Sequence, residues 1–246
     1  MKGYPMNRKI VAGLLALSLL SAAPAALAQT APDYAAIVAA PDRSDADRKV
    51  DLQRAPAAWL AYLGVRPGMT VLDVFDANGY KAELISRAGA KVYAQNSPQG
   101  DARVGEKLRA RAKIPGGANI VPVVRPLDDP APPGVQFDLV TFFMAYHDIT
   151  YLGVDRPKML KAIYAALKPG GYFIMGDWSA KPGAGISVVK TLHRSDEKLV
   201  TGEIEAAGFK LVGHGDFLRH PEDKRDTHSH SASIVDGYVL KFQKPL

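Results

Sequence analysis

Residues 71–80 read VLDVFDANGY, an apolar run that ends in an acidic residue and continues into a loop with one glycine. The run predicts a strand over 70–74, and the spacing of apolar residues after Gly79 predicts a helix over 79–88. In a doubly wound sheet the loop that follows the first strand lies beside the ligand. This stretch therefore indicates both the fold and the place where a site is expected.

The same alternation of short apolar strands and amphipathic helices continues along the chain. Strands are expected at residues 70–74, 91–95, 119–124, 137–145 and 171–177, with helices near 79–88, 101–113 and 156–167. Strands separated by a helix pair in parallel, because a parallel pair needs a long crossover connection. The pattern predicts an α/β fold with a doubly wound, mostly parallel sheet and helices on both faces.

The C-terminal segment departs from this alternation. Ser195 is expected to cap a helix that ends at Gly208, and strands are expected at 210–217 and 235–242 with only a polar loop between them. Two strands joined without a helix are most simply antiparallel. The sheet should then have seven strands with an antiparallel C-terminal strand, and residues 45–246 should form a single domain.

The first 28 residues have the pattern of a signal peptide. Three basic residues precede the apolar stretch 10–20, and the small-residue site Ala26-Leu27-Ala28 follows it. We expect cleavage after Ala28, a periplasmic or secreted product and no stable membrane insertion. The alternative is an uncleaved anchor, but the apolar stretch is shorter than the ~20 residues that a span needs. Residues 29–44 are expected to be an arm that lies on the domain or is partly disordered.

Charge and cysteine content narrow the class of partner. The chain of 246 residues has 31 basic and 25 acidic side chains, a formal charge of +6, and no cysteine. Loss of the three basic residues of the signal peptide lowers the charge to +3, which does not favour nucleic acid. Without cysteine, neither a disulfide framework nor attachment of lipid to an N-terminal cysteine is possible. We expect a small-molecule substrate and no nucleic acid, and the sequence leaves the oligomeric state open.

Four strings carry a family resemblance: PGMTVLDV (67–74), FDLVTFFMAYHD (137–148), MLKAIYAALKPGGYFIMGDW (159–178) and EAAGFKLV (205–212). They resemble motifs of the class I S-adenosylmethionine-dependent methyltransferases, and the likeness spans residues 59–244. The whole chain most resembles exported bacterial members of that family. The resemblance implies a Rossmann-like fold, S-adenosylmethionine as cofactor and an unspecified methyl acceptor. The alternative is a catalytically retired relative that binds a small molecule or a protein in the periplasm.

The loop after the first strand departs from the family pattern. Phe75, Ala77 and Gly79 stand where the family has three glycines. Because a non-glycine residue in the left-handed region costs about 1–2 kcal/mol, we expect a reshaped loop rather than a strained one. Phe75 and Asp76 would then point toward the place of the methionine carboxylate. Asp73 keeps the family's carboxylate at the strand end, where it either orients the loop or contacts the ligand.

A second departure follows the second strand. The family places an acidic residue there to accept hydrogen bonds from the ribose, but this chain has Gln95 and Asn96. An amide oxygen accepts more weakly than a carboxylate, so cofactor affinity should fall. Asn96 is equally well explained as a turn residue before Pro98. The candidate cofactor-binding residues are Asp73, Phe75, Asp76, Ala77, Gly79, Tyr80 and Asn96.

The end of the fourth strand carries the candidate catalytic residues Tyr146, His147 and Asp148. His147 could take a proton from the acceptor, because its ordinary pKa is near neutrality. Tyr146 and Tyr80 could face the sulfonium through their rings, an interaction of about 0.5–2 kcal/mol. In the alternative reading, His147 bonds a backbone carbonyl and Asp148 caps the next segment.

Two further segments supply candidate substrate-binding residues. Asp177 and Trp178 end the fifth strand, and His193 and Arg194 precede the last helix. The resemblance implies a His-Arg pair at the acceptor site, where Arg194 could bind an acidic group through two hydrogen bonds. Arg194 could equally pair with Asp177 or Asp196.

Four other histidines, His214, His220, His228 and His230, raise the question of a metal. Their spacing matches no compact ligand motif, and they lie in and beside a polar loop. The sequence therefore predicts no metal site.

Overall fold

The computed structural model describes residues 1, 3 and 30–246. The expected signal peptide, 1–28, and its cleavage site lie outside the described residues, apart from residues 1 and 3. Within 30–246, no helix has the length and hydropathy needed to cross a membrane.

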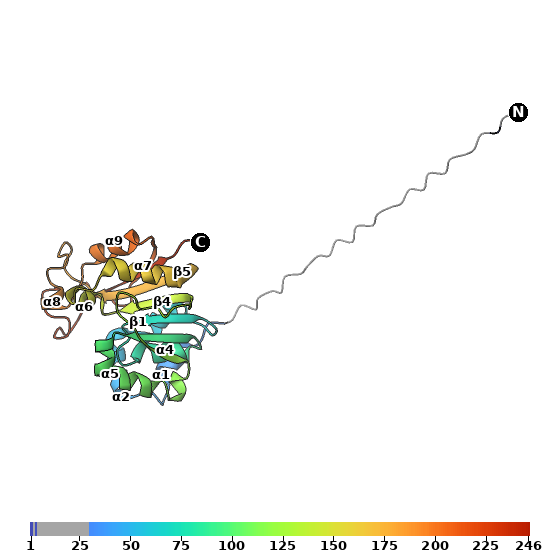
Figure 1. Ribbon diagram of the computed structural model, residues 1–246. Coiled ribbons are helices and arrows are strands. Elements are labelled where there is room, and N and C mark those ends of the chain that lie inside the picture. Colours follow the sequence, from blue (N-terminus) through green and yellow to red (C-terminus); the bar gives the residue numbers. More distant parts are fainter. Residues whose placement is uncertain (2, 4–29) are drawn as a thin grey trace.

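Seven strands form one sheet in the order β3-β2-β1-β4-β5-β7-β6 (Figure 1). Strands β1 to β5 are parallel, and β7 is antiparallel to both β5 and β6. This confirms the predicted seven-stranded, doubly wound sheet. The strands are β1 (Thr70–Val74), β2 (Lys91–Asn96), β3 (Ile120–Val124), β4 (Phe137–Phe143), β5 (Leu167–Trp178), β6 (Lys210–Gly215) and β7 (Gly237–Gln243).

Helices cover both faces of the sheet (Figure 1). Helices α1, α2, α4 and α5 lie on one side of it, and α7 and α9 lie on the other. The helices are α1 (Tyr34–Ala39), α2 (Asp45–Arg54), α3 (Pro56–Leu63), α4 (Tyr80–Arg87), α5 (Pro98–Arg111), η1 (Pro115–Gly117), α6 (Tyr146–Tyr151), α7 (Arg156–Ala166), α8 (Val189–Leu192) and α9 (Glu197–Ala206).

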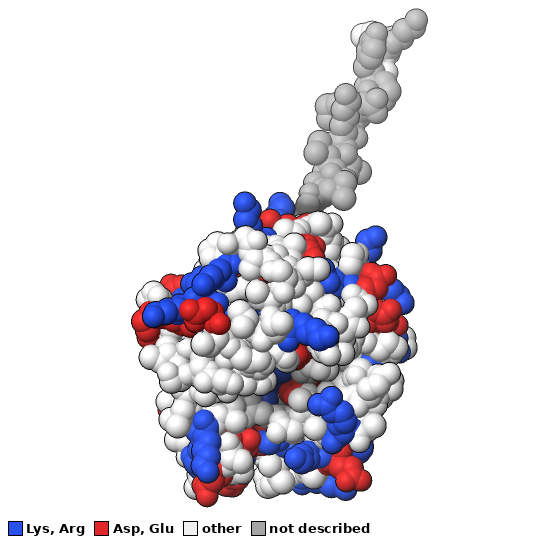
Figure 2. Space-filling view, turned by 90° about the vertical axis from the view of Figure 1, so that its left-hand side faces the viewer, with Lys and Arg blue, Asp and Glu red and all other residues white. Residues whose placement is uncertain are grey.

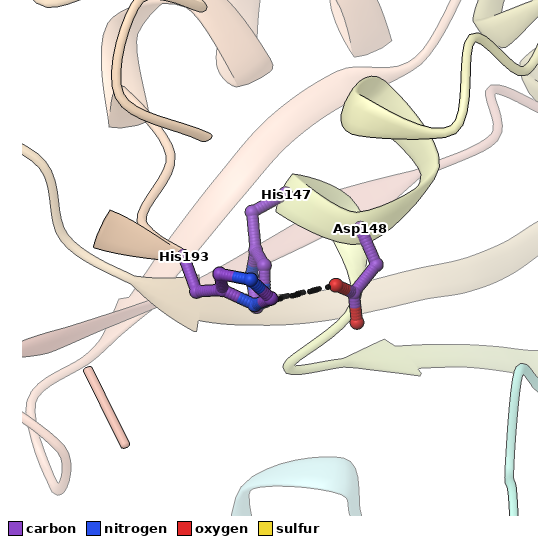
Figure 3. A group of neighbouring side chains, drawn as sticks. All are labelled: His147, Asp148 and His193. Atoms are coloured by element: carbon purple, nitrogen blue, oxygen red, sulfur yellow. Dashed lines mark ion pairs between the residues drawn. The ribbon is translucent and has the colours of Figure 1, made fainter. Parts of the chain in front are cut away.

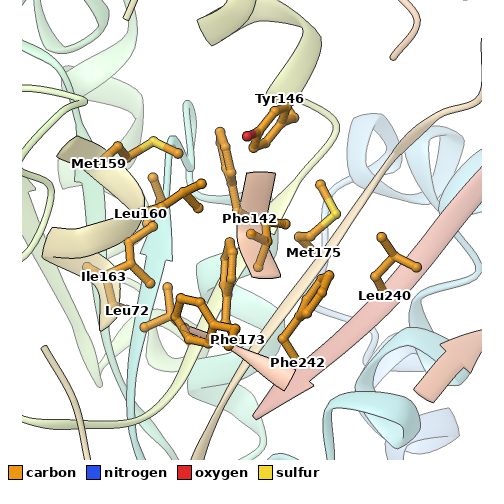
Figure 4. Packing of buried hydrophobic residues seen from close by; sticks show 14 of the residues in the cluster. Leu72, Phe142, Tyr146, Met159, Leu160, Ile163, Phe173, Met175, Leu240 and Phe242 are labelled. Carbon is orange, nitrogen blue, oxygen red and sulfur yellow. The ribbon is translucent and has the colours of Figure 1, made fainter. Parts of the chain in front are cut away.

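The core has two parts because successive side chains of a strand point to opposite faces. Val71 belongs to the cluster that includes α3 and α4, whereas the next residue, Leu72, belongs to the cluster that includes α7 and α9. Figure 4 shows the second cluster, in which Phe142 and Phe173 pack between sheet and helices. Burial on both faces fixes the register of the strands, and with it the position of their carboxyl ends.

Several element boundaries differ from the prediction, and two of them have clear local reasons. Helix α5 begins at Pro98 instead of 101, because Ser97 caps it by accepting a hydrogen bond from the Gly100 amide at 3.0 Å. Strand β4 ends at Phe143 instead of 145, because Met144 has φ of 57° and turns the chain into α6. The expected arm contains α1, which Asp33 caps.

Candidate functional site

A cleft of about 350 Å³ lies beyond the carboxyl ends of β1 and β4. This is the switch point of the sheet, because the chain builds outward in opposite directions from these two strands. Figure 2 views the side of the molecule on which α6 and α8 lie, and it shows a hollow near the middle of that face. The lining comes from α2, α3, α4 and α6, the loop after β1, the end of β4 and the loop before β7: Asp47, Val50, Arg54, Pro56, Trp59, Phe75, Asp76, Ala77, Asn78, Tyr80, Lys81, Phe143, Met144, Ala145, Asp148, Leu218 and His230.

The loop after β1 keeps the left-handed backbone that glycines would allow. The φ angles are 55° at Phe75, 63° at Ala77 and 89° at Gly79. The expectation of a reshaped loop is therefore wrong: the backbone conformation is retained in spite of the side chains. Met144 and His193, with φ of 57° and 49°, are strained beside the same site. Such strain, about 1–2 kcal/mol for each residue, is typical of functional sites.

Asn96 and Gln95 hold this strained loop. The Phe75 amide donates to Gln95 Oε1 at 3.0 Å, and the Ala77 amide donates to Asn96 Oδ1 at 2.9 Å. Asn96 Nδ2 donates in return to the Ala77 carbonyl at 2.8 Å. A carboxylate could not make this last bond because it has no N–H. Both amides are buried and engaged by the protein, so neither is free to bind a ribose.

Asp73 and Asp76 are buried beneath the loop. Asp73 Oδ1 accepts a hydrogen bond from Thr141 Oγ1 at 2.8 Å, and Asp76 Oδ1 accepts one from the Ala82 amide at 3.3 Å. Burial raises the pKa of Asp73 well above its ordinary value, Lys81 opposes this shift, and Asp76 adds to it. The two carboxyls connect β1, β4 and the first turn of α4, which favours the orienting role for Asp73.

Phe75 does not close the cleft. The residue is half-buried, packs against the core cluster on the α7 side of the sheet and also lines the cleft. The remaining volume lies within the range of about 300–1,000 Å³ that is usual for small-molecule sites.

Arg54 supplies a cation to the wall of the cleft. Its guanidinium lies 5.0 Å from the ring centroid of Trp178, and within residues 30–246 no carboxylate forms an ion pair with it. Burial lowers the pKa of Arg54, and Tyr80 and Asp177 partly offset this effect. The Asp51 carboxylate, also on α2, is bonded elsewhere, because it accepts a hydrogen bond from the Tyr80 hydroxyl at 2.7 Å. The sequence analysis missed Arg54, whose only signal was a polar residue at the end of α2 before Pro56.

Behind the cleft, His147 and Asp177 form a buried pair. His147 Nδ1 lies 2.7 Å from Asp177 Oδ1, and Asp177 Oδ2 accepts from the His147 amide at 2.8 Å and from Ser195 Oγ at 2.7 Å. Burial lowers the pKa of His147, but the charges of Asp177 and Asp148 outweigh it, so the net shift is upward. The partner of His147 is therefore the carboxylate of Asp177 and not the backbone carbonyl that the alternative reading of the sequence expected.

Asp148 extends this group to the cleft, which it lines. Its Oδ1 lies 3.5 Å from both His147 Nε2 and His193 Nδ1. Figure 3 shows His147 and Asp148 on α6 and His193 after α8, with the side chains directed toward one another. Burial and then the neighbouring His147 ring lower the pKa of His193. His228 and His230, on the loop between β6 and β7, lie beside His193 with ring centroids 4.5 and 5.5 Å away.

The structure separates two expected site residues from the cleft. The Tyr146 hydroxyl donates to Glu203 of α9 at 2.5 Å, and its ring belongs to the core cluster in Figure 4. Arg194 is fully buried and pairs with Asp223 at 2.8 Å, not with Asp177 or Asp196. Asp196 instead caps α9. Both Tyr146 and Arg194 hold elements together and line no part of the cleft.

Comparisons with known proteins agree with this architecture. Residues 72–175 match a family model described as a methyltransferase domain. No curated protein sequence gives a significant match. A SAM-dependent methyltransferase from Aquifex aeolicus is 18% identical with a TM-score of 0.56, and the match covers 86% of this chain and 98% of that one.

Two other solved structures show the range of activities on this fold. The glycopeptide N-methyltransferase MtfA, complexed with sinefungin, is 16% identical with a TM-score of 0.58 over 83% of this chain and 89% of that one. The [4+2]-cyclase SpnF is also 16% identical, with a TM-score of 0.58 over 82% of this chain and 81% of that one. The family model and these neighbours support the predicted fold of the chain. This chain has the class I S-adenosylmethionine-dependent methyltransferase fold, and the methyltransferase domain model matches its residues 72–175.

Proposed function

We propose that the protein is an S-adenosylmethionine-dependent methyltransferase that acts on a small molecule. The observation that carries the proposal is the open cleft at the switch point, with the unpaired Arg54 on one wall and Asp148 on another. Such a cleft can bind a carboxylate at one place and accept a proton at another.

The residues of the cleft fit the amino-acid half of the cofactor. Arg54 is available for a carboxylate because it has no ion-pair partner within residues 30–246. The apolar rings of Trp59, Phe75 and Phe143 offer dry contacts. The ribose end differs from the family pattern, since the Asn96 amide is bonded to the loop. We therefore expect binding that depends strongly on Arg54 and gains little from a ribose contact at Asn96.

S-adenosylmethionine, when bound, supplies an electrophilic methyl group on a sulfonium. The protein's part is to orient the reactants, exclude water and remove the acceptor's proton. Asp148 lies at the cleft surface, where it can take that proton, and His147 lies 3.5 Å behind it. Asp177 fixes the ring of His147 and stabilises its charged form.

Export and domain extent are part of the proposal. The pattern of residues 1–28 supports cleavage after Ala28 and a mature protein outside the cytoplasm, with residues 45–246 as one domain. Mass analysis of the protein recovered from its native host would give the mass of residues 29–246. A chain that retains residues 1–28 would contradict export by cleavage.

A melting-temperature screen with S-adenosylmethionine, S-adenosylhomocysteine and NAD tests the function. We expect stabilisation by the first two ligands only, about 2.7 kcal/mol at a hundredfold excess over Kd. Arg54→Gln should remove most of this shift. The matched control is Arg109→Gln, which alters an exposed ion pair with Asp101 far from the cleft lining. Absence of a shift at millimolar ligand would contradict the proposed function.

A further inference from the structure

We propose that His147, Asp148 and His193 form a binding site for one divalent transition-metal ion. One donor atom from each lies within 4.8 Å of the other two. Asp148 Oδ1 is 3.5 Å from both His147 Nε2 and His193 Nδ1. Two ligand atoms at ~2.1 Å from a tetrahedral ion lie about 3.4 Å apart, so these separations already match those of a coordination shell.

One donor atom of the cluster, on His193, lacks a hydrogen-bond partner within the described residues. This atom is Nδ1, and it is buried. A buried polar nitrogen without a partner is unfavourable. The backbone of His193 is also held in the left-handed region, with φ of 49°. An ion between His193 and Asp148 would give the nitrogen a bond.

His147 has the surroundings of a metal-ligating histidine. Asp177 Oδ1 lies 2.7 Å from Nδ1, so the proton is held on that nitrogen and the lone pair of Nε2 is directed to the other side. Asp177 is itself fixed by Ser195 Oγ at 2.7 Å. A carboxylate behind the histidine orients the ring and increases the basicity of the ligating nitrogen.

The loop between β6 and β7 supplies further imidazoles on the open side. His228 and His230 lie 5.3 Å apart between ring centroids, and both are next to His193. The His230 amide donates to His228 Nδ1 at 3.2 Å, which leaves Nε2 of His228 for an ion. His230 and Asp148 line the cleft, so an ion here would have open positions toward a ligand of the cleft.

The donor set indicates the class of metal. Imidazole nitrogens together with one carboxylate suit zinc and other divalent first-row transition metals, such as iron. Calcium and magnesium instead prefer oxygen ligands. The sequence pattern did not indicate this site, because His147 on α6 and His193 after α8 are 46 positions apart in the chain and only the fold brings them together.

Metal titration tests the site independently of methyl transfer, since the proposal does not rest on the proposed function. The protein, purified without a histidine tag and dialysed against EDTA, is titrated with Zn²⁺ in a calorimeter and with Co²⁺ by visible absorption. We expect one ion per chain and a cobalt spectrum of low coordination number. Asp148→Asn and His193→Gln should each weaken Zn²⁺ binding at least tenfold, as loss of a ligand does.

The matched controls are His214→Gln and His220→Gln, whose side chains are exposed and outside the group. These variants should bind Zn²⁺ as the unchanged protein does. Circular dichroism establishes that each variant is folded, and Asp148, which is partly exposed, is not expected to unfold the chain on substitution. Absence of saturable binding, or equal loss in the control variants, would overturn the proposal.

Discussion

At the scale of single residues, Asn96 explains how the loop after β1 tolerates Ala77. Its amide both accepts from and donates to the backbone of Ala77, and thereby holds a conformation that glycine would adopt without strain. Where the methyltransferases that the chain resembles have a glycine and an acidic residue, this chain has Ala77 and Asn96, which are bonded to each other. The sequence showed both departures but not the bonds between them.

Asn96→Asp should destabilise the protein, although it restores the acidic residue of the family. The new carboxylate would face the Ala77 carbonyl without an N–H to donate, in a buried position. We expect a loss of about 1–3 kcal/mol in urea denaturation. Asn78→Asp is the control, because Asn78 only accepts, from the Tyr80 amide, and a carboxylate can do the same. Equal stability of the Asn96→Asp and Asn78→Asp variants would show that the hydrogen bond from Asn96 Nδ2 to the Ala77 carbonyl does not contribute to stability.

Ala77→Gly should be neutral or stabilising, because glycine relieves the strain at φ of 63° and the exposed methyl group packs against little. The same change at Ala58, exposed on α3, should destabilise by about 1 kcal/mol, since glycine lowers helix stability. Thermal denaturation of the two variants makes the comparison. A loss at Ala77 as large as that at Ala58 would mean that the left-handed backbone is not strained.

At the scale of elements, helix α2 is attached over the cleft by ion pairs. Arg111 of α5 bonds Asp47 of α2 at 2.7 Å and also contacts Glu83 of α4. The sequence predicted a helix here, but not that Arg111 turns inward to join three helices. Such partners come from different parts of the chain, which is why patterns within one element do not reveal them.

The Asp47 pair makes stability depend on pH. Burial raises the pKa of Asp47, but hydrogen bonds from Arg111 and Ser44 outweigh it, so the net shift is downward. A lowered carboxyl pKa contributes stability above the unfolded value of about 4, and this is lost as pH falls through the folded value. Asp47→Asn should therefore cost stability at pH 7 and less at pH 3 in denaturation curves. The control Asp101→Asn, which removes an ion pair with the exposed Arg109, should change stability little at either pH. An equal loss of stability at both pH values would contradict the lowered pKa of Asp47.

At the scale of the whole molecule, the sequence was sufficient for the sheet and insufficient for the site. The position of short apolar runs determined each strand, because both faces of the sheet are buried. It also placed His147 and Asp148 at the cleft end of β4. It could not place Arg54, nor pair Arg194 with Asp223, nor bring His193 to Asp148, since each of these contacts joins residues that are far apart in the sequence.

The most direct test of the central claim is a crystal structure of the protein with S-adenosylhomocysteine. We predict the ligand in the cleft between the loop after β1 and the end of β4, with its carboxylate bonded to Arg54 and the Asn96 amide still bonded to Ala77. A ligand bound elsewhere, or a cleft filled by the Phe75 ring in crystals grown with the ligand, would contradict the account.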